Sequence, residues 1–222
     1  MTDSTAQEPT AGPQLPTAIL IIRHGEKPPD NDGHPPSARH SAHPPFGVEI
    51  DGTQNAESLI PQGWQRAGGL ATFFAPCGGT FTSPLVTRPT MIAVPHYADA
   101  PKHRTYQTVW PLAEKLGTEP AVTVPVGHES ELASWLLGQA GQTVLVCWEH
   151  QHIEDLTTAL GSVIAGGDVP GPWPSDRFDI VVALTADQAS GDHYVCTQVP
   201  QLLLAGDSSQ PIPGPHQPPS RG

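Results

Sequence analysis

The sequence predicts an α/β fold of three layers, with helices on both faces of a mostly parallel central sheet. Short runs that are apolar on both faces, typical of buried parallel strands, alternate along the chain with segments apolar at helical spacing. The first such run, Ala-Ile-Leu-Ile-Ile at residues 18–22, precedes a helical pattern over 61–74. That helix begins with Pro61, a residue favoured at the first helical position.

The alternation continues through most of the chain. Further strands are expected at 90–94, 121–126 and 143–148. Further helices are expected at 104–116, which ends before Gly117, and at 129–138 and 153–160. The last two predicted strands, 178–184 and 193–199, are close in sequence, which permits antiparallel pairing at a sheet edge.

The distribution of the 27 prolines and 22 glycines divides the chain. A single domain is expected over residues 16–206, between a mobile N-terminal tail at 1–15 and a disordered proline-rich tail at 207–222. A proline-rich insertion over 28–57 follows the first strand. Its pairs at 28/29, 35/36 and 44/45 exclude the interior of a helix.

Charge and composition exclude several classes of function. With 10 Lys+Arg against 22 Asp+Glu, the net charge is -12, so neither nucleic acid nor an anionic membrane is an expected partner. No apolar run approaches the ~20 residues that span a bilayer, and the acidic N-terminus does not resemble a signal peptide. The three cysteines lack metal-site spacing. We expect a cytoplasmic protein without metal or cofactor, and the sequence carries no signal for an oligomeric state.

The chemistry-bearing motif follows the first strand directly, as Arg23-His24-Gly25-Glu26-Lys27-Pro28. In an open α/β sheet, ligands bind in the crevice at the carboxyl ends of the strands. Gly25 permits a tight turn there and a close approach of the backbone to a ligand. The sequence thus predicts a site that presents Arg23 and His24.

Four segments, in the expected order, resemble the histidine phosphatase superfamily, which has the phosphoglycerate-mutase-like fold. Residues 21–26 resemble its strand that runs into Arg-His-Gly, and 59–67 (Leu-Ile-Pro-Gln-Gly-Trp-Gln-Arg-Ala) resemble its following helix. Residues 104–108 (Arg-Thr-Tyr-Gln-Thr) are similar to the helix that carries a second Arg, and the strand at 144–147 leads into His150, the place of the second His. The Glu-Lys-Pro extension resembles a bacterial branch.

The resemblance implies a metal-independent phosphatase acting on a small phosphate monoester. His24 would attack phosphorus to give a phosphohistidine, while Arg23 and Arg104 hold the nonbridging oxygens. His150 would donate to the same oxygens, and Glu26 and Lys27 are expected to line the substrate pocket. The alternative is a phosphate-ester or anion-binding protein of this fold with little or no turnover.

The group that protonates the leaving oxygen is left open. Some relatives have an Asp directly after the second His, but this chain has Gln151 there. Glu129 and Glu149 are the leading candidates; Glu131, Glu26 or no acid at all are the alternatives. Glu149 would point away from His150 if the strand continued through it, because successive strand side chains alternate in direction.

Overall fold

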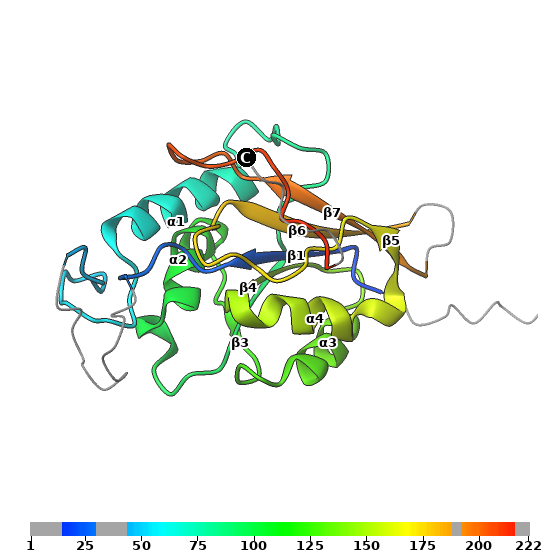
Figure 1. Cartoon of the computed structure of the whole chain (residues 1–222), viewed down its shortest axis with the longest axis horizontal. Helices are drawn as coiled ribbons and strands as arrows, with labels where there is room; N and C mark the ends of the chain where they lie inside the picture. Colours follow the sequence, from blue (N-terminus) through cyan, green and yellow to red (C-terminus); the bar gives the residue numbers. More distant parts are fainter. Residues whose placement is uncertain (1–14, 30–43, 188–191, 216–222) are drawn as a thin grey trace, which may run out of the picture.

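The structure is a computed structural model that describes residues 15–29, 44–187 and 192–215. One seven-stranded sheet has the order β3-β2-β4-β1-β6-β7-β5 (Figure 1). β6 runs antiparallel to β1 and β7, and the other pairings are parallel, so the sheet is mostly parallel, as predicted. The strands are β1 (Ala18–Arg23), β2 (Met91–Val94), β3 (Ala121–Val122), β4 (Thr143–Trp148), β5 (Ile164–Gly167), β6 (Ile180–Ala186) and β7 (Tyr194–Pro200).

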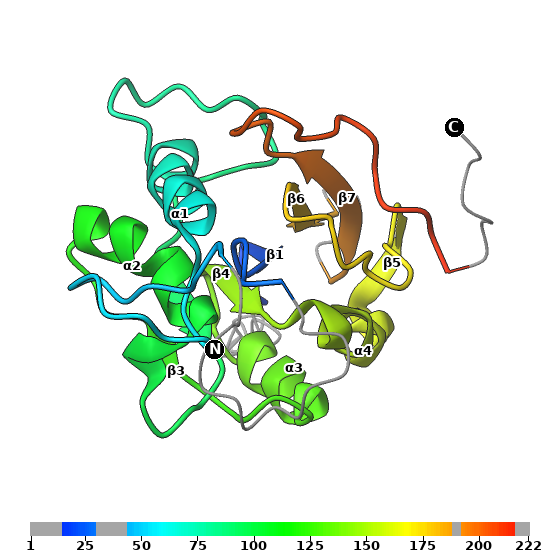
Figure 2. The ribbon, with the colours of Figure 1, turned by 60° about the vertical axis from the view of Figure 1, so that its left-hand side comes forward.

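Helices cover both faces of the sheet, which confirms the three-layer prediction (Figures 1 and 2). α1 (Pro61–Phe74) and α2 (Arg104–Leu116) pack on one face, and α3 (Glu129–Leu137) and α4 (Ile153–Ala159) on the other. β1 serves both cores, with Leu20 and Ile22 on the first face and Ile19 and Ile21 on the second. In the part of the chain that the structure describes, no helix has the length and apolarity to cross a membrane.

β2, β6 and β7 begin and end within two residues of their predicted bounds, and two other strands depart further from the prediction. β3 ends at Val122 rather than 126, because it pairs only with two residues of β2 and leaves the sheet edge before Pro125, which has no N–H to donate. β5 was not predicted, because Ile-Ala-Gly-Gly carries little strand signal. It pairs with β7, where a Cβ on Gly167, with φ of 110°, would lie 2.0 Å from the carbonyl oxygen of Cys196.

The C-terminal segment 207–215 packs against the domain, which corrects the prediction of a disordered tail from 207. Asp207 forms an ion pair of 2.7 Å with the buried Arg66. Ile212 is fully buried, and its backbone N–H and C=O both bond to the side chain of Gln198 at 2.8 Å. The proline-rich composition concealed these two anchoring residues. Residues 216–222, 1–14 of the N-terminal tail and 30–43 of the insertion lie outside the described residues.

Replacing Ile212 with alanine tests this packing. We expect Ile212→Ala to lower the free energy of unfolding by about 2–5 kcal/mol, since it removes a fully buried aliphatic side chain. The matched control Ile50→Ala, at a side chain 71 % exposed, should change it by less than about 0.5 kcal/mol. Urea unfolding measures both, and equal effects of the two substitutions would contradict the packing.

Candidate active site

The site lies where two neighbouring parallel strands end. β1 and β4 pair in a register that sets Arg23 opposite Trp148, the last residue of each strand. His24 then donates its backbone N–H to the carbonyl of Trp148 at 3.2 Å. The side chains of His24, Glu149 and His150 therefore meet at the carboxyl edge of the sheet, the edge that the sequence predicted for the site.

The His24 ring is buried and held by its own loop. Nδ1 lies 2.7 Å from the carbonyl oxygen of Gly25, and because a carbonyl only accepts, Nδ1 carries the proton and Nε2 keeps its lone pair in the neutral ring. The side chain is 1 % exposed, and this burial lowers the pKa of His24. His24 is thus a neutral imidazole at neutral pH with a free lone pair on Nε2.

The loop that carries His24 is fixed by both helices of the first face. Gly25 donates its N–H to Thr108 Oγ1 at 2.8 Å, and the Thr108 hydroxyl donates to the carbonyl of Arg104 at 2.7 Å. On the other side, Gly63 of α1 packs so closely that a Cβ there would lie 2.5 Å from the carbonyl oxygen of Glu26. The motif residues at 59–67 and 104–108 therefore both hold the loop after β1.

Glu149 points at His24. β4 ends at Trp148 and Glu149 keeps an extended backbone, but the chain turns into a 3-10 helix at His150–His152, so the strand alternation does not continue to His150. Its Oε2 lies 3.3 Å from His24 Nε2, and its Oε1 accepts a hydrogen bond of 3.0 Å from the Tyr97 hydroxyl. Burial acts to raise the pKa of Glu149, but the contacts with His24, Arg104 and Tyr97 outweigh it and lower the pKa to about 2. The carboxylate is therefore ionised.

His150 and Arg23 flank the same point. The rings of His24 and His150 meet edge to face with centroids 6.1 Å apart. Burial, helped by the charge of Arg23, lowers the pKa of His150 to about 4, so this ring is neutral as well. Burial also lowers the pKa of Arg23 to about 10, which leaves its guanidinium charged at neutral pH.

Several buried nitrogens at this point have no hydrogen-bond partner among the described residues: Arg23 Nε and Nη2, Arg104 Nε, His150 Nδ1 and His24 Nε2. Other atoms of the two arginines are engaged, since Arg104 Nη1 donates to the carbonyl of Ala56 at 3.0 Å. A buried N–H without a partner costs about 1–3 kcal/mol, so such groups gather where a ligand supplies acceptors. The arrangement of two guanidinium groups and two imidazoles fits an anion with several oxygens.

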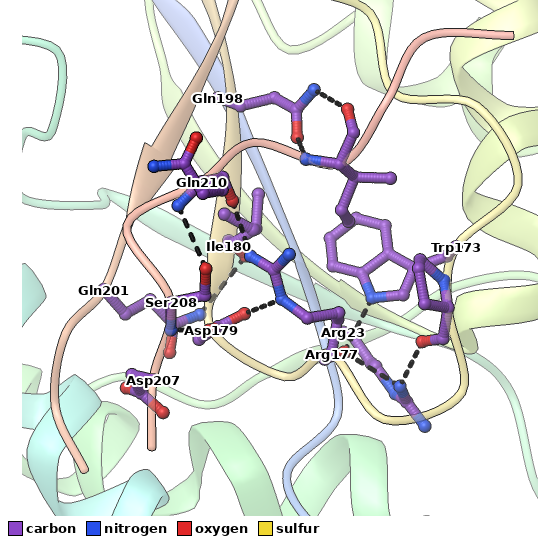
Figure 3. A network of polar contacts seen from close by, with 12 residues as sticks. Arg23, Trp173, Arg177, Asp179, Ile180, Gln198, Gln201, Asp207, Ser208 and Gln210 are labelled. Atoms are coloured by element: carbon purple, nitrogen blue, oxygen red, sulfur yellow. Dashed lines mark hydrogen bonds and ion pairs between the residues drawn. The ribbon is translucent and has the colours of Figure 1, made fainter. Parts of the chain in front are cut away.

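The segment 174–178, which precedes β6, holds the guanidinium group of Arg23. Its Nη1 donates to the carbonyls of Pro174 at 3.0 Å and Arg177 at 2.8 Å, and its Cζ lies 3.7 Å from the ring centroid of Phe178. Trp173 donates its indole N–H to the same Arg177 carbonyl at 2.7 Å (Figure 3). Sequence reasoning missed these anchors, because backbone carbonyl acceptors leave no residue-type signal.

The C-terminal segment completes this support (Figure 3). The Arg177 side chain donates to Asp179 at 2.8 Å and to the carbonyl of Gln210 at 2.7 Å. Asp179 in turn accepts the backbone N–H of Ser208 at 2.5 Å. Residues 207–213 therefore hold in place the segment that orients Arg23.

The other predicted site residues are engaged by other groups. Glu129 Oε1 accepts from the Trp148 indole at 3.0 Å and the Gly127 N–H at 2.9 Å, and Glu131, 68 % exposed, pairs with His128 at 2.8 Å. Glu26 forms a double hydrogen bond with Arg66 at 2.8 and 3.0 Å. Lys27 follows Glu26 in the same loop, and its charge is among the causes that lower the pKa of His150. The structure thus gathers Arg23, His24, Arg104, Glu149 and His150, and turns the carboxylates of Glu26, Glu129 and Glu131 to other partners.

Comparisons with known proteins give matches to solved structures only. No family model and no curated protein matches the chain. A mycobacterial glucosyl-3-phosphoglycerate phosphatase in complex with VO3 is 14 % identical with a TM-score of 0.45, covering 82 % of this chain and 97 % of that chain. A phosphoserine phosphatase from Entamoeba histolytica, in complex with 3-phosphoglyceric acid, is 13 % identical with a TM-score of 0.42, covering 81 % and 94 %. At these identities and scores, the residues of this chain must carry a functional assignment by themselves.

Proposed function

We propose that this chain is a phosphatase of the histidine phosphatase type, which hydrolyses a small phosphate monoester through a phosphohistidine on His24 without a metal. One observation carries the proposal: His24 Nε2 and nitrogens of Arg23, Arg104 and His150 are all buried without a partner among the described residues, the His150 ring lies edge to face with that of His24, and the charges of both arginines act on His24. A phosphoryl group over Nε2 would satisfy these donors with its nonbridging oxygens. Such preorganised donors are the main source of catalysis in phosphoryl transfer.

The reaction has two displacements at phosphorus. Nε2 of His24 attacks, the N–P bond forms, and the bond from phosphorus to the ester oxygen breaks. Water then attacks the phosphohistidine, the N–P bond breaks, and inorganic phosphate leaves. Arg23 and Arg104 stabilise the negative charge of the nonbridging oxygens in both steps. The Gly25 carbonyl orients the His24 ring by accepting its Nδ1–H.

Glu149 is the carboxylate placed to move protons in both steps, because its Oε2 lies 3.3 Å from the nucleophilic nitrogen. With a pKa of about 2 it starts ionised. A monoester that binds as the monoanion brings a proton, since the second pKa of a phosphate group is about 6. Glu149 can take this proton and pass it to the leaving oxygen, then accept a proton from the attacking water and give it up to the departing phosphate, which restores the carboxylate. A carboxylate so close to Nε2 favours turnover over the alternative of a pure anion-binding protein.

The proposal is tested by trapping the intermediate. The full chain is incubated with a 32P-labelled generic monoester in the presence of EDTA and quenched with base, in which phosphohistidine survives. We expect phosphate release to continue in EDTA and the label to map to the peptide that contains His24. Turnover that stops in EDTA and returns with added metal would overturn the metal-free mechanism. Tight phosphate binding without release from any ester would favour the binding protein.

Glu129, the other leading candidate for the acid, is expected to stabilise the fold instead. Glu129→Gln keeps an acceptor for Trp148 and Gly127, so kcat should change by less than about 3-fold, well below the loss expected for a general acid. Glu129→Ala leaves the buried indole N–H of Trp148 unpaired, and should lower the free energy of unfolding by about 1–3 kcal/mol. Steady-state kinetics and urea unfolding measure the two effects. A loss of kcat above about 100-fold in Glu129→Gln would return Glu129 to the role of proton donor.

A further inference from the structure

The three side chains that meet at the edge of the sheet also have the composition of a transition-metal site. One ligand atom from each of His24, Glu149 and His150 can be chosen so that all lie within 4.8 Å of one another. We propose that these residues bind a divalent transition metal of the Zn²⁺ class when no phosphate ester is present, and that the bound metal inhibits the protein. This use of the site goes beyond the proposed metal-free reaction.

The closest pair already has the spacing of a tetrahedral metal centre. His24 Nε2 and Glu149 Oε2 are 3.3 Å apart. Bonds of about 2.0–2.2 Å to zinc place neighbouring tetrahedral ligands about 3.3–3.6 Å apart. In the tautomer set by the Gly25 carbonyl, Nε2 of His24 carries no proton, so its lone pair is available to a metal. A cation between Nε2 and Oε2 could bond to both atoms.

Neighbouring groups hold both proposed ligands by hydrogen bonds to the atoms that face away from the metal position. Metal-ligating histidines usually donate their other ring N–H to a carbonyl or carboxylate, and here Nδ1 of His24 is bonded to the Gly25 carbonyl at 2.7 Å. The second carboxylate oxygen of Glu149 is fixed by the Tyr97 hydroxyl at 3.0 Å. His24 Nε2 and Glu149 Oε2 are therefore held 3.3 Å apart before any metal binds.

The ligand types select the class of metal. Two imidazoles and one carboxylate suit zinc and its neighbours, whereas Mg²⁺ and Ca²⁺ prefer oxygen ligands. Three protein ligands leave the fourth tetrahedral position of the metal open, as in catalytic zinc sites. The charges of Arg23 and Arg104 oppose a cation here, so binding should be weaker than at a structural zinc site.

A second cluster provides the control. His152 Nδ1 lies 3.5 Å from both Glu129 Oε1 and Asp155 Oδ2. Glu129 Oε1 already accepts two N–H groups, from Trp148 and Gly127, which leaves it little capacity for a metal. His152→Gln therefore removes a nearby imidazole without touching the proposed ligands.

Direct binding to the full chain tests the proposal. Zn²⁺ affinity is measured by competition with a chromogenic chelator, and Co²⁺ is used as a visible probe of four-coordinate geometry. We expect one Zn²⁺ per chain at this site. Loss of a group that only hydrogen-bonds to a metal ligand costs about 10–100-fold in affinity, so loss of a ligand itself, in Glu149→Gln or His150→Gln, should weaken binding by more than about 100-fold. Tyr97→Phe, which removes only a hydroxyl, should weaken it about 10-fold.

Two results would overturn the metal site: unchanged Zn²⁺ affinity in Glu149→Gln and His150→Gln, or loss of the binding in His152→Gln. Inhibition is the second readout, because a metal on Nε2 removes the attacking lone pair. Zn²⁺ should raise the KM for the ester with kcat unchanged, and EDTA should reverse the effect. The binding measurement contains no ester, so zinc binding can be observed even if the protein has no phosphatase activity. An active phosphatase that binds no zinc would overturn only the metal site and leave the proposed function standing.

Discussion

His24→Ala should lower kcat/KM for every phosphate monoester by about 10⁴-fold or more. Removal of a covalent nucleophile deletes the reaction path rather than one stabilising contact, and comparable losses in other enzymes reach about 10⁶. The substitution leaves the donors of Arg23, Arg104 and His150 in place. Vanadate or phosphate should therefore still bind, with an affinity within about 10-fold of that of the unmodified protein, because each arginine contact is charge-assisted and independent of the ring.

A matched histidine on the surface controls for the loss of an imidazole. The side chain of His128 is half exposed and pairs with the exposed Glu131, so His128→Ala should leave kcat/KM within about 2-fold and stability within about 0.5 kcal/mol. Initial rates with p-nitrophenyl phosphate and calorimetric phosphate titrations measure the two variants. Activity that is indifferent to His24→Ala would remove His24 as nucleophile.

The elements with strong local signals could be predicted from the sequence. α1, α2 and β4 begin and end at the predicted residues, because Pro61 and Gly117 mark helix ends and 143–148 is a continuous, largely apolar run. Gly117 indeed adopts the left-handed conformation, with φ of 66°, that glycine favours after a helix. β5 and the C-terminal segment depend instead on distant partners, Cys196 for Gly167 and Gln198 for Ile212, which no local pattern encodes.

The site, too, has residues that the sequence could predict and contacts that it could not. Arg23 and His24 follow a buried strand, so the rule that ligands bind at strand ends placed them without knowledge of the fold. Whether Glu149 and His150 reach the same site depended on where the extended backbone gives way to the turn at His150, and element ends are the least certain part of a sequence-based prediction. The anchors of Arg23 are carbonyl groups of Pro174 and Arg177, and every residue has a carbonyl.

Glu149→Gln should separate the two chemical steps. Glutamine has the shape of glutamate and can still accept the Tyr97 hydrogen bond, but it cannot carry a proton. For alkyl phosphates, whose leaving alkoxide needs a proton, kcat should fall by about 10²–10⁴-fold, the usual contribution of general acid catalysis. A nitrophenolate leaves without protonation, so formation of the phosphohistidine from p-nitrophenyl phosphate should be nearly unaffected.

The second step then limits the variant, because the carboxylate that takes the proton of the attacking water is gone. Rapid mixing of Glu149→Gln with p-nitrophenyl phosphate should give a burst of one nitrophenolate per site, followed by slow release and an accumulated phosphohistidine. The exposed Glu131→Gln is the matched control and should show the kinetics of the unmodified protein. An equal loss on alkyl and aryl esters without a burst would mean that Glu149 only orients His24, and that the protons travel through the substrate and water alone.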